Sequence, residues 1–157
     1  MILVVCGPTG TGKTKLSVEL AKIYNGEIIN ADSMQIYKGL DIGTAKVTKE
    51  EMQHIPHHLL DIKEVEEDYS VFDYQIDARN KIEEIKKKGK VPIFVGGTGY
   101  YLKAVFYDYD FIEEKEKASP FTNLTNEELL ENIEKYECCI PIDPTNHKRL
   151  ARLLEKL

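Results

Sequence analysis

Two kinds of hydrophobic pattern alternate along the first part of the chain. Short continuous apolar runs at residues 2–6 and 91–95 are typical of strands buried in a parallel sheet, and a further short strand is predicted at 27–31. Between these runs, apolar residues recur every three or four positions, which indicates amphipathic helices. Strands and helices that alternate in this way predict an α/β fold with a parallel sheet.

The helix after the first strand is predicted from its apolar spacing and ends at Asn25-Gly26. The apolar residues that indicate it are Leu16, Leu20 and Ile23. Residues 32–48 show no regular period and are expected to form a long loop, and a short strand is expected within residues 56–62.

The clearest helix is predicted to begin after Ser70. Ser70 and Asp73 have the spacing of a capping box, and Gly89 follows three lysines at the expected carboxyl end. Its apolar stripe consists of Val71, Tyr74, Ala78, Ile82 and Ile85. We interpret the lysines at 86–88 as a solvated helix end, with an RNA-binding patch as the alternative.

The pattern changes after Tyr107, where a charged and irregular stretch follows. Thr125 and Glu128 have capping-box spacing for a short helix that carries Leu129, Leu130 and Ile133. A last helix is predicted to start at Asp143-Pro144. Its apolar face consists of Leu150, Leu153, Leu154 and Leu157.

These patterns predict a single domain with three parts. They are an α/β core over residues 1–107, a linker region over 108–142, and a C-terminal helix over 143–157. The chain has 157 residues, of which 42% are hydrophobic and 31% charged, so it can build one soluble domain with its own core.

Composition excludes several classes of protein. No apolar run is long enough to cross a membrane, and the apolar N-terminus lacks the basic leader of a signal peptide. The three cysteines (Cys6, Cys138 and Cys139) suggest neither a disulfide framework nor a zinc site, so the reducing cytoplasm is expected. We also expect a monomer. The net charge of −6 argues mildly against a large nucleic-acid surface but leaves room for a local basic patch.

A phosphate-binding loop opens the chain. The motif G-x-x-x-x-G-K-[ST] is complete here, between a predicted strand and a predicted helix. Its residues, called the phosphate loop below, are Gly7, Pro8, Thr9, Gly10, Thr11, Gly12, Lys13 and Thr14. The glycines allow backbone N–H groups to point at phosphate oxygens, Lys13 adds a mobile charge, and the Thr14 hydroxyl can ligate Mg²⁺. The motif does not specify which group the bound diphosphate is attached to, and ATP is the default ligand for such a loop.

Polar residues follow three of the predicted strands. The phosphate loop follows the first strand, Asp32-Ser33 the second, and Gly97-Thr98 the strand at 91–95. The carboxyl ends of parallel strands lie at one edge of a sheet, so we expect these clusters to converge on one cleft. A carboxylate beside a phosphate site can hold magnesium or accept a proton, whereas Asp32 taken alone would indicate an ordinary Asx turn.

Four blocks of the sequence resemble the tRNA dimethylallyltransferase family. In the family's order, they are GPTGTGKT, INADSMQIYKGLDIGTAK, IPHHLLDI and VPIFVGGTGYYLKAV, and they span about the first 105 residues. These enzymes transfer an isopentenyl group from dimethylallyl diphosphate to N6 of the adenosine next to the anticodon. The resemblance implies a P-loop NTPase-like parallel sheet flanked by helices. It also implies a reduced helical insertion over residues 108–142, because family members run to about twice this length, in line with a two-domain enzyme. By the same resemblance, the helix over 143–157 returns to the P-loop core over 1–107.

The resemblance also implies roles at the reaction centre. Asp32 matches the proposed general base, and the phosphate loop, with Lys13 and with Mg²⁺ held through Thr14, matches the site of the donor diphosphate. Thr98 matches a threonine beside the reaction centre that hydrogen-bonds the diphosphate, with a helix cap as the alternative.

Further residues are implied to contact the tRNA anticodon stem-loop. The segment that contacts the flipped-out adenosine corresponds to Asp32, Ser33, Met34 and Gln35. Arg149 and Arg152 fall where the family places arginines near the diphosphate and the RNA, although solvent-facing arginines are an equal alternative.

Two pairs of neighbouring residues have competing interpretations. Tyr101, with Tyr100, is a candidate to line the prenyl channel or to stack on a base, and core packing is expected for at least one of them. His57 and His58 resemble a metal pair, but adjacent side chains of a strand point to opposite faces, so we interpret them as structural or surface residues.

Two other functions are compatible with the phosphate loop. A related prenyltransferase could act on free adenine nucleotides, because a small acceptor tolerates the loss of an RNA clasp. A P-loop kinase or nucleotide-binding module is the other alternative, and the lack of arginines in residues 108–126, where a kinase lid would need them, counts against it.

Overall fold

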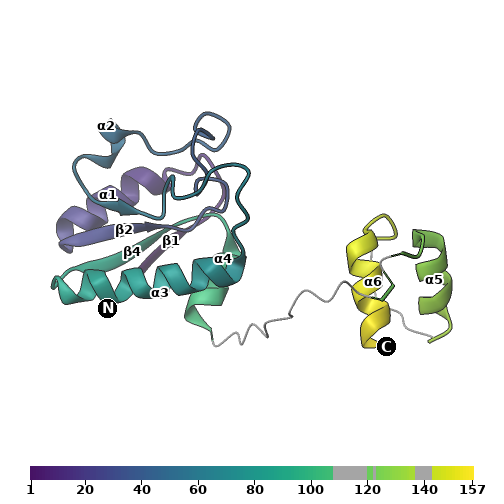
Figure 1. Ribbon diagram of the computed structural model, residues 1–157. Helices are drawn as coiled ribbons and strands as arrows, with labels where there is room; N and C mark the ends of the chain where they lie inside the picture. The colour runs from purple at the N-terminus through teal and green to yellow at the C-terminus, as the bar shows by residue number, and fades with distance from the viewer. Residues whose placement is uncertain (108–119, 122, 137–142) are drawn as a thin grey trace. The chain divides into compact units, whose positions relative to one another are not determined.

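The computed structural model describes residues 1–107, 120–121, 123–136 and 143–157 (Figure 1). The chain divides into two compact units, Met1–Phe111 and Ile112–Leu157, and each is described by itself. The single domain expected from the sequence stays a prediction. Cys138 and Cys139 lie outside the described residues, whereas Cys6 is an exposed free thiol.

The first unit is built on a four-stranded parallel sheet with the order β1-β4-β2-β3. Its strands are β1 (Leu3–Cys6), β2 (Gly26–Asn30), β3 (His57–His58) and β4 (Val91–Gly96). In the middle of the sheet, Ile93 of β4 lies opposite Leu3 of β1 on one side and Ile28 of β2 on the other. The predicted α/β fold with a parallel sheet is confirmed.

Helices cover both faces of this sheet (Figure 1). They are α1 (Lys13–Ile23), α3 (Val71–Lys87) and α4 (Gly99–Phe106), with a short α2 (Lys49–Met52) in the loop before β3. Successive side chains of a strand point to opposite faces, so Ile28 and Ile93 pack with α1. Ile29 and Phe94 pack in the larger core beneath α3 and α4.

The helix α3 matches its prediction closely. Ser70 Oγ accepts a hydrogen bond from Asp73 N at 3.2 Å, and Asp73 Oδ2 accepts one from Ser70 N at 2.8 Å, which completes the capping box. The predicted stripe faces the core, and Tyr74 and Ala78 are fully buried in it. Gly89 ends this region with a φ of 70°, a left-handed conformation that favours glycine.

The predicted apolar stripe of α1 is confirmed only at Leu20, which packs against the core. Leu16 and Ile23 are 52% and 72% exposed, and the buried face consists of Ser17, Val18 and Ala21. These smaller side chains allow the helix axis to approach the sheet, where Ile28 and Ile93 already fill the space.

The first strand is also less buried than its apolar run predicts. Val4 is 45% exposed and Cys6 is exposed, because β1 lies at the edge of the four-stranded sheet that the described residues form. A continuous apolar run therefore does not distinguish a central strand from an edge strand.

The second unit pairs α5 (Asn126–Glu134) with α6 (His147–Lys156) around a small core of its own. The predicted capping box of Thr125 and Glu128 is confirmed. The helix α6 begins later than expected, because Asn146 is its N-cap and accepts a hydrogen bond from Arg149 N at 3.1 Å.

The apolar face of α6 packs on α5 within this unit. Its buried residues are Leu150, Ala151 and Leu154, and those of α5 are Leu129 and Ile133. Leu157, which was expected on this face, is 42% exposed. The expected return of this helix to the P-loop core stays a prediction. Among the described residues, no helix is both long and apolar enough to span a membrane.

The carboxyl ends of β2 and β4 lie in very close contact at Gly96. A Cβ added to Gly96 would lie 2.2 Å from both the carbonyl carbon and the carbonyl oxygen of Ala31. Ala31 N donates a hydrogen bond to Val95 O at 2.7 Å, so the two chains continue side by side beyond the strands. Only glycine fits at this position, and it fixes where the following loops begin.

A buried carboxylate lies near the opposite end of the sheet. Glu27 is 2% exposed, and its oxygens accept hydrogen bonds from Lys90 Nζ at 2.8 Å and Lys88 Nζ at 3.0 Å, with His58 Nε2 at 2.7 Å. Burial raises the pKa of Glu27, but these partners outweigh it and lower the pKa to about 2. His58 is thus structural, as expected, and His57 Nδ1 contacts Ile55 O at 2.8 Å.

Replacing Glu27 by glutamine should destabilise the first unit by about 2 kcal/mol near pH 7, because two lysines lose their counter-charge while remaining partly solvated. The folded-state pKa lies below the ordinary value of 4.5, so the contribution is complete above that value and is lost as pH falls toward 2. Urea unfolding should therefore show a difference between wild type and Glu27→Gln that shrinks with acidification. The exposed Glu66→Gln is the control, and an unchanged difference at about pH 3 would contradict this account.

Replacing Gly96 by alanine should destabilise the first unit by about 1–3 kcal/mol, because the new methyl group forces the backbone of Ala31 to move. Gly99→Ala is the matched control, since a Cβ there meets nothing within 4 Å. Thermal unfolding of both variants measures the effect. Equal midpoints for Gly96→Ala and wild type would show that the close contact is not required.

Candidate functional site

Three loops meet at the carboxyl ends of β1, β2 and β4. Gly97 lies beside the phosphate loop, because a Cβ on it would be 3.4 Å from Gly7 O. Thr98 N donates a hydrogen bond to Ala31 O at 3.1 Å, and Thr98 Oγ1 accepts one from Ser33 N at 3.0 Å. The expected convergence of the three polar clusters is confirmed.

The phosphate loop has the backbone conformation that its glycines permit. Gly10 and Gly12 have φ angles of 82° and 80°, in the left-handed region that favours glycine. Gly12 is the N-cap of α1 and has no side chain with which to cap it, so the first N–H groups of the helix are suited to an anion. Lys13 Nζ donates a hydrogen bond to Pro8 O at 2.6 Å and thus folds back over the loop.

Asp32 follows β2 in the Asx turn that its sequence context suggested. Its Oδ1 accepts a hydrogen bond from Met34 N at 3.0 Å, and its own N–H donates to Asn30 Oδ1 at 3.1 Å. The Asx turn and a role in catalysis are compatible, because Asp32 also lines a pocket.

Asn30 is a positioning residue that the sequence analysis missed. It is 4% exposed, and its Nδ2 donates hydrogen bonds to Asp32 O and Leu59 O, both at 3.0 Å. It thereby fixes the backbone on both sides of the site. In the sequence, Asn30 is a single amide side chain at the end of an apolar strand. That position alone does not indicate which groups it hydrogen-bonds.

Thr98 joins two loops instead of capping a helix. It occupies the N-cap position of α4 but makes no side-chain capping hydrogen bond. Its hydroxyl accepts from Ser33 N and donates to Ser33 Oγ at 3.3 Å. The helix-cap alternative is therefore wrong, and Thr98 holds the loop after β4 to the loop after β2.

A pocket of about 600 Å³ extends from the phosphate loop past Asp32. It is lined by Thr9, Asp32, Met34, Gly39, Leu40, Asp41, Ile42, Gly43 and Thr44. This volume is within the range of small-molecule sites. Residues 39–44 form much of its wall, and no role for them was predicted from the sequence.

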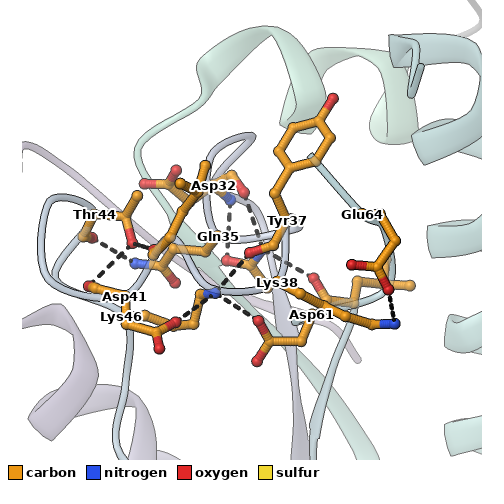
Figure 2. A network of polar contacts seen from close by, with 12 residues as sticks. Asp32, Gln35, Tyr37, Lys38, Asp41, Thr44, Lys46, Asp61 and Glu64 are labelled. Atoms are coloured by element: carbon orange, nitrogen blue, oxygen red, sulfur yellow. Dashed lines mark hydrogen bonds and ion pairs between the residues drawn. The ribbon is translucent and has the colours of Figure 1, made fainter. Parts of the chain in front are cut away.

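A buried lysine anchors this wall (Figure 2). The Lys46 side chain is 5% exposed, and its Nζ contacts Asp41 Oδ1 at 2.8 Å, Asp61 Oδ1 at 2.5 Å and Tyr37 O at 2.7 Å. Burial lowers the pKa of Lys46, but the hydrogen bonds from Lys46 to Asp41 and Asp61 outweigh it and raise the pKa. Lys46 thus stays charged and ties the pocket wall to the body of the unit.

Gln35, which was expected to contact RNA, also belongs to this network (Figure 2). Its Nε2 donates a hydrogen bond to Thr44 O at 3.0 Å, and Thr44 Oγ1 donates to Leu40 O at 2.5 Å. In this structure the Gln35 side chain therefore holds the pocket wall, while Met34 beside it is 50% exposed.

Tyr101 lies in the core and not at the RNA-facing surface assigned to it. It is 7% exposed, and its ring stacks on Tyr74 with centroids 4.0 Å apart and an interplanar angle of 16°. The expectation that at least one of the two neighbouring tyrosines packs in the core is confirmed, and its partner, Tyr100, is 54% exposed. A ring stacked inside the core has no free face for a base, which corrects the assignment of Tyr101.

Not all predicted site residues belong to the same unit. The phosphate loop, Asp32, Ser33 and Thr98 come together in the first unit. Arg149 and Arg152 lie on α6 of the second unit, where both are exposed. Their role toward the diphosphate and the RNA stays a prediction.

Comparison with known sequences gives consistent matches. A family model described as IPP transferase matches residues 35–157. A tRNA dimethylallyltransferase from Anoxybacillus flavithermus is 49% identical over 165 residues, which cover 98% of this chain and 51% of that protein. The one from Bacillus subtilis is 46% identical over 165 residues, covering 99% and 52%. The chain thus spans about half the length of these curated relatives.

Solved structures agree with the sequences. The full-length tRNA isopentenylpyrophosphate transferase from Bacillus halodurans matches with a TM-score of 0.71 and 41% identity, over 99% of this chain and 54% of that one. A eukaryotic dimethylallyltransferase acting on tRNA matches with a TM-score of 0.75 and 34% identity, over 98% and 40%. This chain combines a P-loop-like sheet with four sequence blocks of one family, and the matches agree with both. The chain therefore belongs to the tRNA dimethylallyltransferase (IPP transferase) family.

Proposed function

We propose that this chain transfers a dimethylallyl group from dimethylallyl diphosphate to N6 of the adenosine next to the anticodon of a tRNA in the cytoplasm, and releases diphosphate. One observation carries the proposal: a phosphate loop and a carboxylate lie at the same sheet edge, where Gly97 is beside Gly7 and Thr98 holds Ser33 next to Asp32. The names of the relatives give the same reaction class.

Asp32 is the proposed general base. The N6 lone pair of adenine is delocalised into the ring and is a weak nucleophile. In the reaction, nitrogen forms a bond to the allylic carbon, the bond from that carbon to diphosphate oxygen breaks, and the electron pair leaves with the diphosphate. Transfer of the N6 proton to Asp32 keeps the product uncharged.

The phosphate loop is proposed to stabilise the leaving group. Negative charge grows on the diphosphate as the bond breaks, and the N–H groups at the start of α1, which no side chain caps, would stabilise that charge. Lys13 would exchange its hydrogen bond to Pro8 O for one to the diphosphate. Thr98 would add a hydroxyl donor from the neighbouring loop.

Mg²⁺ is the proposed cofactor, and the residues present fit it. Thr14 is the second residue of α1 and directly follows Lys13 of the phosphate loop. Its hydroxyl and the oxygens of the donor diphosphate are the hard oxygen ligands that Mg²⁺ prefers. When bound, the ion neutralises charge on the diphosphate.

Transfer can be tested with labelled dimethylallyl diphosphate and Mg²⁺, with an anticodon stem-loop and AMP offered separately. We expect label in the RNA. Asp32→Asn should lower kcat at least about 100-fold while donor binding persists, because only proton removal is lost. The exposed Asp68→Asn is the control. Label in AMP alone would assign the chain to the nucleotide prenyltransferases, and binding of ATP without binding of the donor would contradict the proposal.

Lys13→Met should weaken binding of dimethylallyl diphosphate about 10- to 100-fold, because a charge-assisted hydrogen bond to phosphate is lost. Lys15→Met is the control, since Lys15 is an exposed lysine of the same helix. Isothermal titration calorimetry with the donor measures both. Equal affinities for the two variants would exclude Lys13 from the diphosphate site.

A further inference from the structure

The proposed reaction gives no role to the outer wall of the pocket, residues 39–44. At its tip, Ile42 is 98% exposed and lines the pocket. Single exposed apolar residues are common at protein surfaces. Ile42 differs because it lies at a site rim, on a segment that many contacts hold in place.

The contacts that hold this wall come from both of its ends. Lys46 Nζ contacts Asp41, Asp61 and the carbonyl of Tyr37, and Lys46 N donates a hydrogen bond to Asp41 O at 3.0 Å. Within the segment, Ala45 N donates to Ile42 O at 3.2 Å. These contacts hold the residues on both sides of Ile42.

The chemistry of the pocket indicates which part of the substrates it accepts. Two carboxylates, Asp32 and Asp41, line it, but Lys46 balances the charge of Asp41. The charge of Asp32 repels phosphate, so the diphosphate belongs at the phosphate loop and an uncharged group belongs here. Met34 and Ile42 add exposed apolar surface beside these carboxylates. A heteroaromatic base with an exocyclic amino group satisfies both features, because its faces are apolar and its amino group donates hydrogen bonds.

We propose that residues 39–44 form the base-binding wall of the acceptor site, that Ile42 packs on the face of the acceptor base, and that Lys46 is the positioning residue that holds this wall. The inference rests on the proposed function and adds to it the element that recognises the acceptor. It also explains why a lysine is buried in a loop with two carboxylates and a backbone carbonyl around it.

Ile42→Ser provides a clean test, because an almost fully exposed side chain contributes little to stability. With the full chain and saturating donor, we expect the KM for the stem-loop to rise about tenfold. The kcat, the KM for dimethylallyl diphosphate and the thermal midpoint should not change. Ile23→Ser is the matched control, since Ile23 is 72% exposed at the far end of α1, and it should leave all four values unchanged.

The role of Lys46 is tested by measuring KM for the stem-loop and kcat separately, as for Ile42. Lys46→Met should raise the KM for the stem-loop at least as much as Ile42→Ser, and Lys46→Arg should restore it in part because the charge returns. A role in stability alone would lower the thermal midpoint of Lys46→Met without raising the KM for RNA at low temperature, and that result would overturn its assignment as a positioning residue.

The same measurements show whether the inference alone fails or the proposed function fails with it. If wild type modifies the stem-loop and Ile42→Ser has the same KM for it, the inference is wrong and the function stands. A raised KM for the donor in place of the RNA would assign the wall to the prenyl tail and also overturn the inference. If wild type labels no acceptor and binds no stem-loop, both are wrong.

Discussion

The close approach of β4 to β2 at Gly96 is the constraint on which the rest of the site depends. Because no side chain fits between Gly96 and the backbone of Ala31, the loops that follow these strands start side by side. Gly97 then lies beside the phosphate loop, and Thr98 reaches Ser33. A parallel sheet always collects its carboxyl ends at one edge, but this contact sets the spacing at which their chemistry can cooperate.

Buried polar groups then fix the direction of each loop. Asn30 holds the turn at Asp32, Thr98 joins the neighbouring loops, and Lys46 anchors the pocket wall. Among the described residues, every buried side-chain nitrogen or oxygen has a hydrogen-bond partner. A polar network that is fully paired specifies one geometry, whereas a partly paired one would destabilise the fold. These paired groups therefore define the geometry of the site.

The sequence predicted the features that depend on local chemistry. The capping box at Ser70, the phosphate loop and the clustering of Asp32 with Thr98 follow from short spacings and from the geometry of parallel sheets. The features it missed depend on partners far away in the chain. Glu27 is stable in the core only because two distant lysines and a histidine surround it, and Lys46 is recognisable only once Asp41 and Asp61 are seen beside it.

The central claim is that the loops after β1, β2 and β4 form one site that binds the donor diphosphate. Amide NMR tests this claim most directly. Dimethylallyl diphosphate would be titrated into ¹⁵N-labelled protein in the presence of Mg²⁺. The account predicts that the amides of Gly10, Gly12, Ser33 and Thr98 shift together and give one shared Kd. Shifts confined to the phosphate loop, or loops that saturate at different donor concentrations, would contradict it.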